Sequence, residues 1–191
     1  MRRLPIVPTI VVLIAVGVMI RLGLWQLDRL HEKEAMLMRY NAAQALSAEM
    51  PFPFASDDVD AALFRRSSLN CLSSANPTSR SGRNADGDAG IAQVVTCRTA
   101  SGASVEVVLG LAQSPAIVPW SGGRVSGWIA PGPKLVADPP LAGLASSARP
   151  DPNDIPNNHL AYAVQWFFFA AVAAIIYLLA VRRRVPPAGP L

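Results

Sequence analysis

Residues 157–184 read NNHLAYAVQWFFFAAVAAIIYLLAVRRR and decide the fold class of this chain. No charge occurs from Leu160 to Val181, and a helix over this run, rising about 1.5 Å per residue, is roughly 33 Å long. That length crosses a hydrocarbon core of ~30 Å. The run therefore predicts a transmembrane helix over residues 159–181, followed by a cytoplasmic tail, residues 182–191.

A second apolar run, from Leu4 to Ile20, predicts another span near the start of the chain. Its prolines fall in the first turns, where backbone N–H groups have no intrahelical partner and proline is tolerated. A cleaved signal peptide is the alternative, but no small-x-small cleavage pattern follows, and the apolar residues continue past Arg21. We therefore expect a first transmembrane helix over residues 1–27.

The first span is expected to continue out of the membrane as a helix over residues 28–50. Apolar residues recur here at three- and four-residue steps, as on one face of a helix: Leu24, Leu27, Leu30, Leu37 and Met38. Pro51 and Pro53 are expected to end the helix.

The charges of the chain are arranged unevenly. It has 17 Lys and Arg against 13 Asp and Glu, a net charge of +4. Arginines flank the outer ends of both spans, whereas the segment between them is slightly acidic. The positive-inside rule then places both termini in the cytoplasm and the middle in the periplasm of a bacterial inner membrane. Since the basic excess belongs to membrane anchors, no nucleic-acid-binding face is expected.

The segment 51–158 is long enough for one small domain. Runs rich in Val and Thr at 92–100 and 104–113 flank Ser-Gly-Ala and predict a hairpin, with weaker strands at 63–72 and 124–130. Residues 73–90 and 138–158, rich in small polar residues and in proline respectively, are predicted to be loops. The fold class is thus an α+β membrane protein, with two transmembrane helices flanking a small β-rich periplasmic domain.

Few side chains in this domain suggest chemistry. Cys71 and Cys97 lie in the segment assigned to the periplasm, where a disulfide can persist, but two separate buried thiols explain them as well. A metal pair fits them less well because no histidine lies nearby. The sequence holds two histidines, and it has no phosphate-binding loop, Gly-x-Ser-x-Gly or His-Glu-x-x-His motif. We therefore do not expect an enzyme.

Two stretches at the membrane edges resemble the end motifs of the surfeit locus protein 1 family. They are residues 22–30, LGLWQLDRL, with Lys33, and residues 157–160, NNHL, with Tyr162 and Trp166. The chain departs from the family at residues 109–112, where Leu-Gly-Leu-Ala replaces Asn-Arg-Gly-Trp, and at Gln165, where a threonine is common. Family members are two-span proteins that assist assembly of cytochrome c oxidase. The resemblance therefore implies as partners the oxidase catalytic subunit and the lipid bilayer, with a haem a synthesis enzyme as a further candidate.

The resemblance also implies transient handling of haem a, with His159 as the metal ligand. On a helix with Asn158 as its N-cap, His159, Tyr162 and Trp166 share a stripe with small alanines, which offers room for a flat ligand. The positive end of the helix favours a neutral imidazole that can bind iron. The alternatives are a capping or interfacial role for the histidine and an aromatic-belt role for Tyr162 and Trp166.

Arg21 is the remaining cofactor-binding candidate. It shares a helical face with Trp25 and Asp28, and we expect its side chain to snorkel to the membrane surface. Pairing with Asp28 or with a haem propionate are the alternatives. His31 is expected to be a solvated surface residue rather than a second axial ligand.

Two function classes remain after this reading. The first is a haem chaperone that holds haem a at the periplasmic membrane edge and assists its insertion into the oxidase. The second is a membrane-anchored scaffold that stabilises an oxidase assembly intermediate and binds no cofactor.

Overall fold

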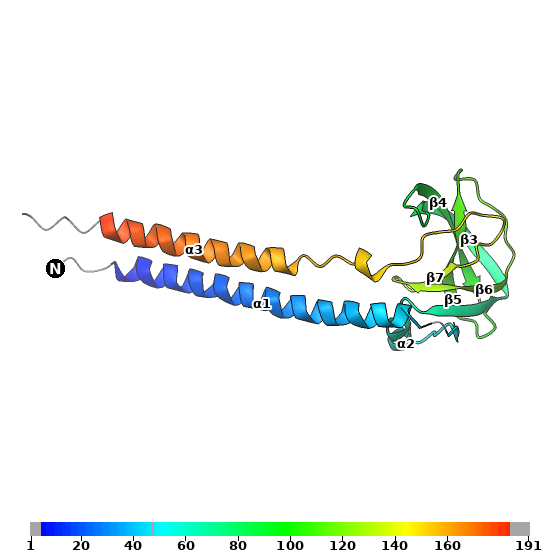
Figure 1. Cartoon of the computed structure of the whole chain (residues 1–191), viewed down its shortest axis with the longest axis horizontal. Coiled ribbons are helices and arrows are strands. Elements are labelled where there is room, and N and C mark those ends of the chain that lie inside the picture. Colours follow the sequence, from blue (N-terminus) through cyan, green and yellow to red (C-terminus); the bar gives the residue numbers. More distant parts are fainter. Residues whose placement is uncertain (1–4, 47, 184–191) are drawn as a thin grey trace, which may run out of the picture. The chain divides into compact units, whose positions relative to one another are not determined.

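The computed structural model describes residues 5–46 and 48–183. A long helix lies at each end of the chain and seven strands lie between them (Figure 1). The chain divides into two compact units, one formed by Met1–Met36 with Pro156–Leu191 and the other by Leu37–Ile155. The predicted α+β class is confirmed.

The first unit is a pair of antiparallel helices, the first part of α1 (Ile6–Gln44) and α3 (His159–Arg183) (Figure 1). Both helices are long and apolar enough to cross a membrane, which supports a membrane protein with two spans. α3 begins at the predicted histidine and includes the first two arginines of the basic cluster.

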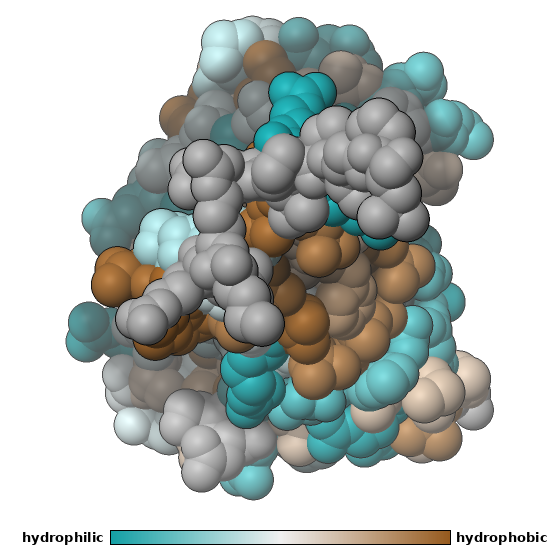
Figure 2. All heavy atoms as spheres, turned by 90° about the vertical axis from the view of Figure 1, so that its left-hand side faces the viewer, coloured by the Kyte–Doolittle hydropathy of each residue, from teal (hydrophilic) through white to brown (hydrophobic). Residues whose placement is uncertain are grey.

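The two helices meet along matching stripes of less exposed residues. The stripe on α1 recurs at steps of three and four residues, and so does the stripe on α3, a spacing typical of helices that cross at a shallow angle. The stripes consist of Thr9, Val12, Val16, Met19, Gly23 and Gln26 on α1, and of His159, Ala163, Trp166, Ala170, Ala173 and Tyr177 on α3. Away from these stripes, exposed apolar side chains cover the helices, as an end-on view shows (Figure 2).

The smallest residues are the ones most deeply buried in this helix pair. Ala163 and Ala170 are 1% and 5% exposed, and Gly23 is the buried residue of α1. Small side chains let two membrane helices approach closely, so van der Waals contact can hold them together in lipid.

α1 ends at Gln44, earlier than the expected stop at Pro51. The Ala45 N–H is shared between the carbonyls of Asn41 and Ala42, each at 3.2 Å, and the Leu46 N–H bonds to the Ala43 carbonyl. This tightening to shorter hydrogen bonds is typical of a last helical turn. The prolines do not end the helix. Instead Met50–Pro51 forms β1, which was not expected.

The second unit contains one sheet in the order β1-β2-β6-β7-β5-β4-β3. The predicted hairpin is confirmed as β4 and β5, which pair antiparallel, and the weaker strand predictions correspond to β2 and β6. Helix α2 (Ser56–Ala62) and strand β7 were not anticipated. The remaining bounds are β2 (Arg66–Cys71), β3 (Ser73–Arg83), β4 (Ala89–Arg98), β5 (Ser104–Ala112), β6 (Gly123–Ala130) and β7 (Lys134–Ala137).

The prediction that residues 73–90 form a loop is wrong, because most of them form β3. This strand is polar on both faces, so its side chains give no alternating pattern, and its backbone pairs with β4 from Ser73 opposite Arg98 to Arg83 opposite Ala89. A bulge between Ala75 and Thr78 accommodates Pro77.

The other predicted loop, residues 138–158, is described throughout and largely confirmed. It holds one short 3-10 helix, η1 (Pro152–Asp154), and a single bridge from Ala145 to Leu111.

The sheet closes on itself because β2 leads directly into β3. Only Leu72 separates these two strands, although they lie near opposite ends of the strand order, and its N–H donates to the Arg98 carbonyl at 2.9 Å. The interior is filled by side chains that are fully buried, including Phe64, Leu109, Ile129 and Leu135. Tyr40, from the end of α1, packs its ring 5.0 Å from that of Phe64.

Candidate functional site

His159 is the first residue of α3, and the carbonyl of Asn158 accepts the Tyr162 N–H at 3.2 Å, which places Asn158 at the N-cap. The Nδ1 atom of His159 lies 2.7 Å from Oε1 of Gln26 on α1. A carbonyl oxygen can only accept, so Nδ1 is the donor in this contact, and in the neutral imidazole the lone pair then lies on Nε2. Nε2 forms no hydrogen bond with any residue that the structure describes.

The alanines expected to leave room for a flat ligand are covered by α1 instead. Ala163 and Ala170 face the other helix, and Gly23 lies so close that a Cβ there would be 2.6 Å from Cε1 of Phe167. Between residues 5–36 and 156–183, the helix interface at this level is filled by the chain's own side chains. A ligand at His159 would have to lie outside the interface.

Tyr162 and Trp166 occupy different parts of the α3 surface. Tyr162 is 51% exposed and lines a shallow hollow on the outer side of α3 with Gln165 and Phe168. Trp166 is half-buried, and its ring meets that of Phe169 edge to face, with centroids 6.3 Å apart. Both placements are typical of aromatic residues at a membrane edge, and within the described part of the chain neither side chain forms a hydrogen bond with His159.

Arg21 is exposed on α1 and forms no ion pair with Asp28 or with any other residue within 5–46 and 48–183. Its neighbour Trp25 is exposed as well. Snorkelling of Arg21 to the membrane surface stays a prediction. His31 is exposed on the same helix.

A cluster around Trp128 was missed by the sequence reading. The Arg149 guanidinium lies 3.4 Å from the centroid of the Trp128 ring, and that of Arg66 lies 5.5 Å from it. Asp138 accepts hydrogen bonds from Trp128 Nε1 at 3.0 Å and from Arg66 at 3.3 Å. Burial lowers the pKa of Arg149, the negative charge of Asp138 partly opposes this, and the positive charge of Arg66 lowers the pKa further. These partners are too far apart in sequence for any spacing pattern to reveal them.

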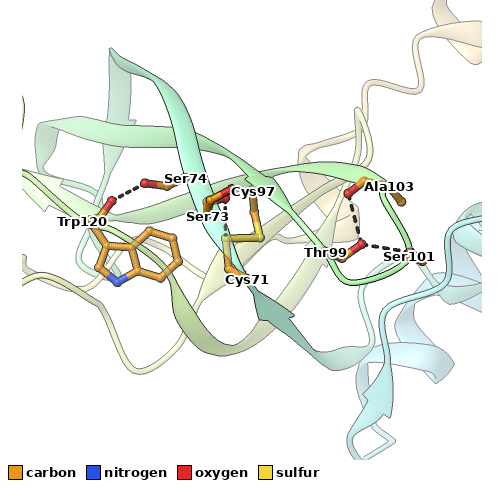
Figure 3. Close-up of a disulfide and its surroundings, with 8 residues drawn as sticks. All are labelled: Cys71, Ser73, Ser74, Cys97, Thr99, Ser101, Ala103 and Trp120. Atoms are coloured by element: carbon orange, nitrogen blue, oxygen red, sulfur yellow. Dashed lines mark hydrogen bonds between the residues drawn. A yellow bond between two sulfur atoms is a disulfide. The ribbon is translucent and has the colours of Figure 1, made fainter.

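Cys71 and Cys97 form a disulfide, which decides the question that the sequence left open. Their Cα atoms are 5.4 Å apart, and Cys97 is fully buried. The bond joins the end of β2 to β4 beside the Leu72 connection, so it reinforces the closure of the sheet (Figure 3).

The model of the SURF1 family matches residues 13–171. The chain belongs to the SURF1 family. This family is generally linked to assembly of cytochrome c oxidase, and the resemblance drawn from the two end motifs is therefore confirmed. No curated protein matches the chain.

The structure adds one fact about the SURF1-family end motifs of this chain. Gln26 belongs to the motif after the first span and His159 to the motif before the second, and their side chains meet. Among the described residues, no group of three or more His, Cys, Asp or Glu could hold a metal ion. A haem iron brings its own four ring nitrogens and needs only one or two protein ligands, so a single available imidazole fits haem better than a bare metal ion.

Proposed function

We propose that this chain assists cytochrome c oxidase assembly by binding haem a at the periplasmic edge of the inner membrane and handing it to the oxidase catalytic subunit. The observation that carries the proposal is the hydrogen bond from His159 Nδ1 to Gln26, which leaves Nε2 able to coordinate iron. The chain's role is to bind haem a and release it to the oxidase, and the haem supplies the redox-active iron that the oxidase requires.

The surface beside His159 could accommodate one face of an amphipathic haem ring. The closed helix interface excludes a ligand from between α1 and α3, so the ring would rest on the lipid-facing side of the helix pair. Exposed aromatic residues, Tyr162 among them, line that surface of α3. Trp166 is an additional candidate contact, and Arg21 is a candidate partner for a propionate.

Two observations support a periplasmic location for the β domain. Arginines lie at the outer ends of both spans, which favours cytoplasmic termini. A buried disulfide is typical of an oxidising compartment such as the periplasm. The proposed partners are the oxidase catalytic subunit, the bilayer and a haem a synthesis enzyme.

The second candidate is a scaffold that stabilises an oxidase intermediate without a cofactor. The close packing of α1 on α3 favours it, because the hydrogen bond from His159 to Gln26 then serves only to hold the two helices together. The two candidates differ in whether Nε2 of His159, the ring nitrogen that does not contact Gln26, coordinates iron.

Replacing each histidine in turn separates the candidates. In cells carrying His159→Ala, we expect the haem a content and the activity of the oxidase to fall severalfold while the variant is present in the membrane at its usual level. His31→Ala is the matched control, since it removes the chain's other imidazole from an exposed position of α1, and it should give wild-type values. Wild-type haem content in the His159→Ala strain would exclude haem delivery and leave the scaffold.

A further inference from the structure

We propose that Gln26 is a positioning residue: its side-chain carbonyl fixes the tautomer and orientation of His159, so that Nε2 is the nitrogen presented to iron. The role of Nε2 as an iron ligand rests on the proposed function. The effect of Gln26 on the tautomer of His159 does not, because it involves only these two residues.

The identity of the two atoms in contact sets the direction of the hydrogen bond. A neutral imidazole carries its hydrogen on one nitrogen and a lone pair on the other. Oε1 of Gln26 lies 2.7 Å from Nδ1, within ordinary hydrogen-bond range, and two lone pairs facing each other at this distance would repel. The Nδ1–H tautomer is therefore the form that the contact selects. Histidines that bind metals generally donate their second N–H to a carboxylate or carbonyl in this way.

The position of Gln26 follows from the register of the two helices. Gly23 lies three residues earlier on the same face of α1 and accommodates the Phe167 ring. At the far end of the pair, the Thr9 hydroxyl hydrogen-bonds that of Tyr177. These two contacts hold the register of α1 against α3, and this register brings the glutamine to the first residue of α3.

A glutamine at a helix interface near lipid needs a partner. An amide without a hydrogen bond is costly in an apolar environment, and a polar contact between membrane helices also contributes modestly to their association. Helix pairing alone would explain the contact as well as positioning does. The test must therefore follow a quantity that helix pairing does not change, and the tautomer of His159 is such a quantity.

Nitrogen NMR of the haem-free protein measures that tautomer directly. The chain has two histidines, so selective ¹⁵N-histidine labelling gives two rings, and a His159→Ala sample assigns them. In the full-length protein in nanodiscs, we expect His159 in the Nδ1–H form and exposed His31 in the mixture usual in water. In Gln26→Leu, the His159 signals should shift to the Nε2–H form or to a mixture.

Thr9→Val is the matched control, because it removes a second polar contact between the same helices without touching His159. It should leave the His159 signals unchanged. A wild-type His159 in the Nε2–H form would overturn the proposal whatever the variants do, and so would equal spectra for wild type and a folded Gln26→Leu.

A titration with haemin provides the second readout. Loss of the outer partner of a metal-binding histidine typically weakens binding about 10- to 100-fold, so the Kd of Gln26→Leu should rise by about that factor and that of Thr9→Val should not. Equal Kd values for wild type and Gln26→Leu would contradict the positioning role. If wild type itself fails to bind haemin, the proposed function fails, while the NMR result still decides whether Gln26 sets the tautomer.

Discussion

Gly23 is the residue on which the approach of α1 to α3 depends most directly. A Cβ placed there would lie 2.6 Å from Phe167, whereas a Cβ at Gly17 of the same helix would meet nothing within 4 Å. The two glycines have the same backbone conformation and the same flexibility, so any difference between them reports on the contact with α3. His159 precedes Phe167 on α3 by eight residues, about two helical turns, so the contact at Gly23 helps to set its position against α1.

Gly23→Leu should therefore weaken the helix pair, and Gly17→Leu should not. Forcing extra carbons into a close-packed contact typically costs about 1–3 kcal/mol, and the loss should appear as a lower melting temperature of the protein in detergent, followed by circular dichroism. Adding Phe167→Ala to Gly23→Leu should restore part of the stability, because it removes the ring that the leucine meets. Equal melting temperatures for the two leucine variants would show that the helices do not pack at this point.

Glu49 links the stability of the β domain to pH. A hydrogen bond from Ser68 and then one from Arg124 lower the pKa of Glu49 below its ordinary value of 4.5. A group whose pKa is lowered by folding stabilises the fold above its unfolded pKa and loses that contribution as the pH falls through its folded pKa.

The β domain should thus lose stability as the pH falls below about 4.5, and Glu49→Gln should reduce the part of that loss that this carboxylate causes. Urea unfolding of the full-length protein at pH 7 and at successive acidic values measures the effect. Glu106→Gln provides a comparison, since its carboxylate pairs with Arg80 on an exposed part of the sheet. An identical pH dependence for wild type and Glu49→Gln would contradict the argument.

At the scale of elements, the junction of β2 with β3 is what turns an open sheet into a closed one. The Leu72 N–H bonds to β4 there, and the Cys71–Cys97 disulfide lies beside it with both sulfur-bearing residues buried. These links tie the end of β2 to β4, although the two strands are separated in the strand order by β6, β7 and β5.

Replacing both cysteines with alanine should destabilise the β domain by about 3 kcal/mol, the entropy expected for a bond that closes a loop of 26 residues. The matched comparison is wild-type protein unfolded with and without a reductant. Reducing the disulfide in the unfolded state should lower the stability of the β domain by the same amount as the double substitution. Because Cys97 is fully buried, the folded protein should resist reduction. Unchanged unfolding midpoints in the double variant would show that the bond adds nothing to closure.

The elements also show where sequence patterns carry information. The two end helices and the β4–β5 hairpin could be predicted because their apolar residues recur with the period of a helix or a strand. β3 could not, since its polar residues join the sheet through backbone pairing alone. The same contrast holds for the candidate site. His159 could be picked out from the sequence because it lies at the start of a predicted span. Its hydrogen bond to Gln26 could not, because it depends on how two helices far apart in the sequence pack.

For the whole molecule, the arginines at the outer ends of both spans predict the orientation in the membrane. Gly87 lies in the exposed turn between β3 and β4, so an inserted reporter should not disturb the strands. A reporter active only in the periplasm should work at Gly87 and fail after Leu191. The same fusions made with a reporter active only in the cytoplasm should give the opposite pattern. Reversed activities would place the β domain in the cytoplasm.

The meeting of Gln26 with His159 has a consequence for biogenesis. The ribosome completes the first of these residues early and the second only after every strand has been synthesised. A nascent or truncated polypeptide that lacks α3 therefore carries the first span and the strands, but not the contact between Gln26 and His159. Under the proposed haem-binding role, translation itself orders the events, because the imidazole is positioned only after α3 has been synthesised.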